Sequence, residues 1–221
     1  MELAKIGGTE IFLDAAEKYA QINDIDARDF EAVWEGLRAQ RAGYEAVFCF
    51  RDSPEPLEAL TDIGAAVLED CVKMRLLPKD FRNRDGGRAE LLSKTDFANF
   101  SAVYDAQAQA EEMFWTGARI LERWDIWRIF VLREGKKIIG FLTLMIDMRD
   151  ASIGEIFCIF ADNRVDMESL FSASATCAFD SGKREVIFMA ELDDAHRMEA
   201  ASAVGFEAVG HYRAYRALVP G

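Results

Sequence analysis

Histidine and cysteine are scarce in this 221-residue chain, which limits the metal sites it can build. Its histidines are His196 and His211, so a histidine-rich metal centre is strongly disfavoured, whereas an ion site made of carboxylates stays open. The cysteines show no CxxC or other metal-ligand spacing. Cys49 and Cys158 fall within apolar runs, where cysteine acts as a small hydrophobic side chain. We therefore expect reduced thiols and no bound metal.

The chain also lacks a long apolar run and an excess of basic residues. No run reaches the roughly 18 residues that a membrane helix needs. The start, MELAKIGGTEIFLD, has neither the basic nor the apolar region of a signal peptide. We therefore expect a cytoplasmic protein with no membrane partner. The formal net charge of −13 disfavours nucleic acid and favours a cationic or amine substrate, although the same charge also serves solubility.

Hydrophobic residues make up 51% of the chain and charged residues 29%, which is typical of a folded globular protein. Apolar periodicity and turn residues divide the chain into alternating strands and helices. Expected strands cover residues 17–23, 44–50, 66–77, 89–92, 127–133, 137–146, 154–160, 185–190 and 208–218. Expected helices cover residues 26–42, a short stretch after 52, 95–108, 110–124, 167–180 and 195–204. The charged stretch 79–88 is the predicted linker.

Two segments of the chain resemble each other. When residues 44–78 are set beneath residues 184–220, Phe48 falls on Phe188, and the helices before and after these strands follow in the same order. Each half of the chain then carries a strand–helix–strand–helix–strand unit. We interpret this as an internal repeat. A chance match between two segments of the same α/β pattern is the alternative.

The order of elements in residues 88–221 resembles the GNAT family of acyl-CoA-dependent N-acyltransferases. The resemblance is carried by the hairpin WRIFVLREGKKIIGFLTLMI, the strand GEIFCIF and the helix–Gly-Phe–strand ending AVGFEAVGHYRAY. It implies a mixed α/β (α+β) fold with a central, mostly antiparallel sheet. It further implies a complete GNAT-like domain over 88–221 and a partial, degenerate copy over 1–87, as in tandem members of the family.

The resemblance also implies a chemistry. Acetyl-CoA or another acyl-CoA would be the co-substrate, with no metal, and a small-molecule or peptide amine would be the acceptor. The backbone of one strand would pair with the pantetheine arm of the coenzyme, a role that depends on no particular side chain. That strand contains Phe157, Cys158, Ile159 and Phe160. The sequence does not indicate the oligomeric state.

The loop that should hold the coenzyme's pyrophosphate departs from the family pattern. Family members have Arg/Gln-x-x-Gly-x-Gly/Ala at a helix start, where glycine lets backbone N–H groups approach the phosphates closely. The corresponding stretch, ADNRVDMESLF (161–171), offers Arg164 as a coenzyme-binding residue but no glycine, in this register or in one starting at Asp162. Acidic residues also stabilise a helix start, so an ordinary capped helix is the alternative. The family's asparagine on the last helix falls near Asp194, a further candidate.

Three groups of residues are candidates for catalysis and acceptor binding. Glu155 is a candidate general base, acting directly or through water, or else a solvated carboxylate at a strand edge. The family's thiolate-protonating tyrosine has no counterpart near Ala201, so Tyr212 and Tyr215 are candidate replacements, unless they are packed strand aromatics.

A cluster that contains Glu111, Glu112 and Trp115 lies where family members border the acceptor pocket. Acidic and aromatic groups together can hold a cation. A helix with a solvated acidic side and a buried aromatic side explains the cluster equally well.

Three functions follow from these features. The leading hypothesis is an N-acyltransferase in which an amine attacks the acyl-CoA thioester directly. The alternative is a non-catalytic GNAT-like protein that binds a ligand or a partner and whose coenzyme loop has lapsed. A third hypothesis, an aminoacyl-tRNA donor as in some tandem relatives, is disfavoured by the acidic charge.

Overall fold

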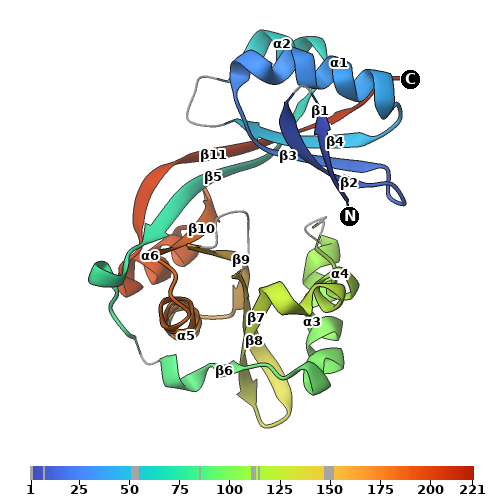
Figure 1. The fold of residues 1–221 in the computed structure, drawn as a ribbon. Coiled ribbons are helices and arrows are strands. Elements are labelled where there is room, and N and C mark those ends of the chain that lie inside the picture. Colours follow the sequence, from blue (N-terminus) through green and yellow to red (C-terminus); the bar gives the residue numbers. More distant parts are fainter. Residues whose placement is uncertain are drawn as a thin grey trace. The chain divides into compact units, whose positions relative to one another are not determined.

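The computed structural model divides into two compact units, which are described separately (Figure 1). Unit 1 contains Met1–Cys71 and His211–Gly221, and unit 2 contains Val72–Gly210. The predicted boundary at 87/88 was drawn from the charged stretch 79–88 and from the family resemblance over 88–221, and it stays a prediction. The structure describes residues 2–6, 8–50, 55–84, 86–110, 113, 115–146 and 152–221.

Unit 1 is a mixed sheet with helices packed on it. Its strands lie in the order β1-β2-β3-β4-β11-β5. Neighbours β1–β2, β2–β3 and β4–β11 are antiparallel, and β3–β4 is parallel. The strands are β1 (Glu2–Ile6), β2 (Thr9–Asp14), β3 (Tyr19–Ile25), β4 (Glu45–Phe50), β5 (Ala66–Leu76) and β11 (Glu207–Leu218), and the helices are η1 (Ala27–Asp29), α1 (Phe30–Gln40) and α2 (Leu57–Asp62).

The helix α1 confirms the periodicity of the sequence. Phe30, Val33, Trp34 and Leu37 recur at helical spacing and are all buried. They pack in one core cluster with Phe48 of β4. Strands β1 and β2 were not predicted.

Unit 2 is a second mixed, mostly antiparallel sheet, in the order β5-β10-β9-β8-β7-β6. Pairs β6–β7, β7–β8 and β8–β9 are antiparallel, and β9–β10 is parallel. Its remaining strands are β6 (Glu90–Leu91), β7 (Trp127–Glu134), β8 (Lys137–Met145), β9 (Ile153–Ala161) and β10 (Glu185–Glu191). The predicted hairpin is thus confirmed as β7–β8, and the predicted mixed α/β class holds in both units.

Helices cover both faces of the unit 2 sheet (Figure 1). One face carries α3 (Phe97–Ala110) and α4 (Gly117–Glu122), and the other carries α5 (Arg164–Asp180) and α6 (Ala195–Val204). Short 3₁₀ turns are η2 (Pro78–Asp80), η3 (Gly86–Arg88), η4 (Lys94–Asp96) and η5 (Trp124–Ile126). The prediction of a helix over 110–124 was wrong in extent, because α4 spans a shorter stretch and ends at Glu122.

The predicted linker is not a free connection. Backbone N–H groups of Arg82 and Arg84 donate to the Val204 carbonyl (2.8 Å) and the Ser172 hydroxyl (2.9 Å). Gly205, with φ of +112°, comes so close to the Asp80 carbonyl that a side chain would not fit. Backbone groups of this stretch are therefore hydrogen-bonded to the end of α6 and to α5. The local sequence does not indicate these contacts.

In the part of the chain that the structure describes, no helix combines the length and the apolar character needed to cross a bilayer.

Candidate functional site

Strands β9 and β10 separate part-way along their length. Their parallel pairing runs from Ile153–Glu185 to Ile156–Phe188 and stops there. Beyond this point β9 continues to Ala161 and β10 to Glu191, all described residues, without further pairing between the two strands. On its other edge β9 stays paired with β8 as far as Ala161. Residues 157–161 of β9 therefore have one edge free of any strand partner, called here the open edge.

A β-bulge lies where the open edge begins. Thr143 of β8 pairs with Cys158 and the next residue, Leu144, pairs with Ile156, so Phe157 is the extra residue. The bulge places Phe157 and Cys158 on the same face of the sheet, among residues that pack with α3 and α4. An extra residue bends a strand and increases its twist, which accounts for the divergence from β10.

Aromatic rings surround the bulge on this face. Trp127 of β7 contacts Phe157 edge-on, with ring centres 5.8 Å apart, and contacts Trp115 in the same way at 5.4 Å. The Tyr104 hydroxyl donates to the Trp115 carbonyl (2.7 Å), which fixes this segment against α3. Trp115 and Phe157 are half-buried, so the aromatic cluster of Trp115, Trp127 and Phe157 is partly accessible.

Glu155 lies two residues before the bulge. It pairs with Met145 across β8 and β9, and Met145 packs on the α3 face. Residues opposite one another in a sheet share a face, so Glu155 faces the same side as Phe157. The side chain is half-buried.

The turn from β9 into α5 is occupied by the chain's own side chains. Asn163 caps the helix, since its Oδ1 accepts from the Asp166 N–H (3.0 Å) and its Nδ2 donates to the Asp166 carboxylate (2.9 Å). Asp166 is buried and forms an ion pair with Arg88 (2.8 Å). A carboxylate already sits at the positive end of the helix, where a phosphate would otherwise bind.

Arg164 and Asp194 are both engaged in helix contacts. The Arg164 guanidinium donates to Glu168 (2.7 Å) and to Glu199 of α6 (3.2 Å), and these two carboxylates raise its pKa, Glu168 most. Asp194 is the N-cap of α6, where its Oδ1 accepts from the Arg197 N–H (2.9 Å). Their assignment as coenzyme-binding residues stays a prediction.

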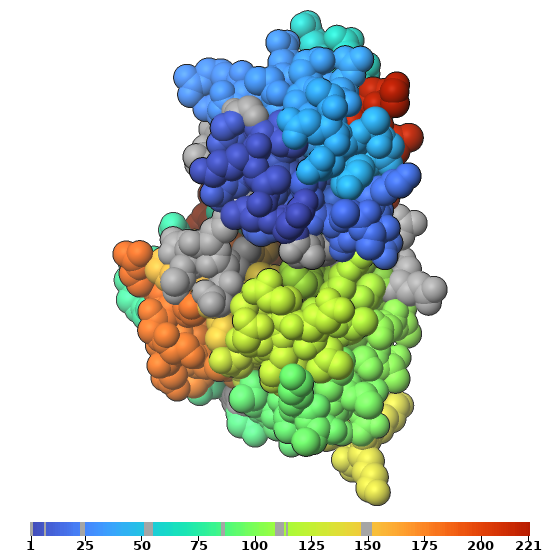
Figure 2. Space-filling view, turned by 45° about the vertical axis from the view of Figure 1, so that its right-hand side comes forward, coloured from blue at the N-terminus to red at the C-terminus, as the bar shows by residue number. Residues whose placement is uncertain are grey.

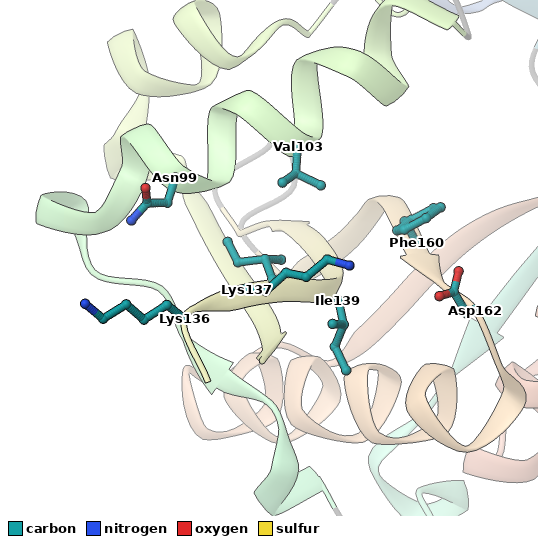
Figure 3. A pocket seen from close by; sticks show the side chains of 8 residues that line it. Asn99, Val103, Lys136, Lys137, Ile139, Phe160 and Asp162 are labelled. Carbon is teal, nitrogen blue, oxygen red and sulfur yellow. The ribbon is translucent and has the colours of Figure 1, made fainter. Parts of the chain in front are cut away.

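A pocket of about 430 Å³ lies beside the end of β9 (Figure 3). Figure 3 shows the Lys137 side chain reaching along it toward Phe160 and Asp162, whereas Lys136 points away from them. The pocket is called here the lysine pocket, and it is lined by Asn99, Val103, Lys136, Lys137, Ile138, Ile139, Phe160 and Asp162.

Comparison with known proteins bears on the fold. No family model and no curated protein matches the sequence. Among solved structures, a GCN5-related N-acetyltransferase from Kribbella flavida matches with a TM-score of 0.70 and 11% identity, over 100% of this chain and 90% of that one. A tandem GNAT protein from the clavulanic acid biosynthesis pathway matches at 0.62 and 10%, over 96% and 79%.

The chain has the GNAT fold.

A Saccharomyces cerevisiae N-myristoyltransferase solved with bound myristoyl-CoA also matches, at a TM-score of 0.59 and 11% identity, over 96% of this chain and 62% of that one. At these identities the likeness is one of fold. The predicted fold is thus confirmed, whereas the predicted duplication with a degenerate first copy stays a prediction.

The described residues of this GNAT fold suit one part of an acyl-CoA better than another. The open edge has no neighbouring strand beyond Ile156–Phe188, so a pantetheine arm could lie along it and direct its amides to the β9 backbone. The start of α5 does not offer the glycine-lined loop expected for the pyrophosphate, because Asn163 and Asp166 occupy it. The arm therefore fits this site, and the helix start does not fit the phosphates.

Tyr215 is part of a hydrogen-bonded network in unit 1. Its hydroxyl donates to Glu55 Oε2 (2.7 Å), and Arg213 bridges Glu55 (3.1 Å) and Asp70 (2.8 Å). Burial, followed by the hydrogen bond to Glu55, raises the pKa of Tyr215, so the hydroxyl stays protonated near neutral pH. The Arg213 hydrogen bond lowers the pKa of Asp70. Tyr212 lies half-buried on the same strand.

The structure brings together some of the predicted site residues. Glu155 and the four strand residues from Phe157 to Phe160 lie on one strand, and Trp115 joins them through Trp127. Glu111 and Glu112 lie outside the described residues, so the acidic part of the predicted acceptor site has no structural description. Among the described residues, no group of three or more histidine, cysteine, aspartate or glutamate side chains is placed to hold a metal.

Sequence reasoning missed Lys137 and Arg88 as parts of this region. Lys137 was assigned only to a strand, and Arg88 to a linker. Their roles depend on contacts with residues 25 or more positions away in the chain, such as Asp162 and Asp166, for which the local pattern carries no signal.

Proposed function

We propose that the protein is an N-acyltransferase that moves an acetyl or related acyl group from coenzyme A to a primary amine. The open edge of β9 carries the proposal, because it starts at a bulge two residues after Glu155 and the β9–β10 ladder does not continue along it. Backbone N–H and C=O groups of residues 157–161 pair with the pantetheine amides and hold the thioester near Phe157. The fold likeness supports this chemistry without specifying the acceptor.

The bound coenzyme supplies an acyl group activated as a thioester. Glu155 accepts a proton from the acceptor ammonium, directly or through one water, so that the neutral amine can attack. Backbone N–H groups beside the bulge polarise the thioester carbonyl. The C–N bond forms, the C–S bond breaks, and the thiolate leaves with a proton. Solvent water is the donor of that proton, and the two tyrosine candidates, Tyr212 and Tyr215, lie in unit 1, where the Tyr215 hydroxyl is engaged with Glu55.

The acceptor should carry positive charge. The chain has a net charge of −13, which raises the local concentration of cations. The aromatic cluster of Trp115, Trp127 and Phe157 lies beside the acyl end of the open edge, and aromatic faces attract ammonium groups. A small-molecule amine or a peptide amine meets both conditions.

The test joins a binding measurement with a rate. Titration calorimetry with acetyl-CoA should give a micromolar dissociation constant. Glu155→Gln should leave that constant unchanged and lower kcat by about 10²–10⁴-fold, which is the usual contribution of a general base. The exposed Glu31 of α1, in unit 1, offers the matched control Glu31→Gln, which should alter neither. No heat at millimolar acetyl-CoA would remove the proposal.

A non-catalytic GNAT-like protein is the second candidate. The observation that favours it is the start of α5, where Asn163 and the Asp166–Arg88 ion pair take the place of a phosphate. On this reading the open edge would receive the backbone of a peptide or another ligand. Absence of acetyl-CoA binding by the wild-type protein, with its fold intact by circular dichroism, would support this second candidate.

A further inference from the structure

The lysine pocket is the second feature of unit 2 that lies against β9, and it differs in charge from the rest of the chain. The Lys137 side chain reaches toward the Asp162 carboxylate, whereas Lys136 lines the pocket with its ammonium group pointing away (Figure 3). The chain as a whole carries a net charge of −13. Across the described residues, neither lysine has a carboxylate partner within ion-pairing distance. Lys137 is therefore a pocket-facing cation that is not engaged in an ion pair with another described residue.

The walls of the pocket combine this charge with apolar surface. Val103 of α3, Ile138 and Ile139 of β8 and the ring of Phe160 form the apolar part. The ring of Phe160 is held by stacking on Phe141, with centres 5.7 Å apart. A volume of about 430 Å³ is in the usual range for small-molecule sites. An anion with an attached flat or apolar group suits such a pocket.

The place of the pocket along β9 identifies which end of a coenzyme it would meet. The open edge runs from Phe157 to Ala161, and Glu155 marks its acyl end. A pantetheine arm carries the thioester at one end and phosphate at the other. Phe160 and Asp162, at the far end of the open edge, line the lysine pocket. The phosphate end of an arm that lies along the open edge would therefore end near Phe160 and Asp162, which line the pocket together with β8 and α3.

We infer that Lys137 binds the nucleotide phosphates of the coenzyme in place of the glycine loop that the start of α5 lacks. The inference rests on the proposed function. Ammonium groups bind phosphate as point charges without requiring close backbone approach, so no glycine is needed. Both lysines are exposed at the start of β8 and its turn, and Figure 2 shows the tip of this hairpin, in yellow, projecting from the surface.

The test is charge reversal at the pocket. Lys137→Glu should weaken CoA binding at least about tenfold in titration calorimetry, because a charge-assisted contact becomes a repulsion. The exposed Lys79 on η2 offers a matched control, since Lys79→Glu changes the net charge equally and should change the affinity less than about twofold. Equal melting temperatures of the three proteins exclude a folding effect.

Titration with dephospho-CoA, which lacks the 3′-phosphate, shows whether Lys137 binds the 3′-phosphate or the pyrophosphate. If Lys137 binds the 3′-phosphate, its replacement should leave dephospho-CoA binding unchanged. If it binds the pyrophosphate, both ligands should weaken by the same factor. Both results support the inference. CoA binding that is equal in wild type and Lys137→Glu overturns it while leaving the proposed function in place, whereas a wild-type protein that binds no CoA removes the proposed function itself.

Discussion

Strands β3 and β4 of unit 1 and strands β9 and β10 of unit 2 are both parallel pairs, and each has a helix between its strands. In unit 2 the ladder ends at Ile156–Phe188 and does not resume. In unit 1 the ladder passes through Ile22–Phe48, becomes irregular, and resumes at Ile25–Phe50. Phe48 and Phe188 are the residues that the sequence repeat places together. The two pairs therefore differ immediately after equivalent positions.

Aromatic packing accounts for the closed pair in unit 1. The ring of Phe48 contacts those of Phe30, Trp34, Phe50 and Tyr215, with centres 5.3–6.4 Å apart. In unit 2 the residue after the last pair is the bulged Phe157, whose ring faces α3 and Trp127. The comparison teaches that a shared order of elements does not suffice to open the edge of a strand. One strand must also separate from its neighbour. Of these two pairs, only β9 and β10 separate without pairing again.

The largest expected effect is on the stability of the β3–β4 pair in unit 1. Phe48→Ala should lower the free energy of unfolding by about 3–5 kcal/mol, because it removes a fully buried ring that four other rings contact. Urea denaturation measures this loss. Phe50→Ala, at the half-buried ring beside it, serves as the control and should cost less. A loss below about 1 kcal/mol for Phe48→Ala would contradict the role of aromatic packing in closing this pair.

A smaller effect is expected at Tyr215, which joins the same aromatic group. Tyr215→Phe keeps the ring but removes the hydroxyl that donates to Glu55. The free energy of unfolding should fall by about 1.5–3 kcal/mol, the usual range for a hydrogen bond to a charged group. Acyl-transfer kcat should stay within about twofold of wild type. A loss of kcat without a loss of stability would instead restore Tyr215 as the thiolate acid, and Tyr212→Phe is the matched comparison.

The smallest expected effect compares the two strand pairs directly. With acetyl-CoA at ten times its dissociation constant, hydrogen exchange in residues 157–161 should slow by about tenfold at amides that face the open edge. Exchange in residues 19–22 of β3, which are already paired with β4, should not change. Equal slowing in both segments would show that the two pairs do not differ in ligand access.

Much of the fold could be predicted because it depends on local patterns. The buried face of α1 follows from four apolar residues at helical spacing, and the β7–β8 hairpin follows from two apolar runs around a glycine turn. Along β9, the identity of the strand was also predictable. Its bulge was not, because an extra residue is visible only when Thr143 and Leu144 are paired with their partners.

The amino-acid sequence by itself determined the succession of strands and helices, the apolar faces and the acidic charge, because each depends on neighbouring residues. Only the tertiary structure decided where the β9–β10 ladder ends, which side chains occupy the start of α5, and which cations lie near it. Arg88 meets Asp166 and Lys137 approaches Asp162 through contacts between elements that are distant in the chain. Such contacts are set by packing between elements, and no periodicity within a single element encodes them.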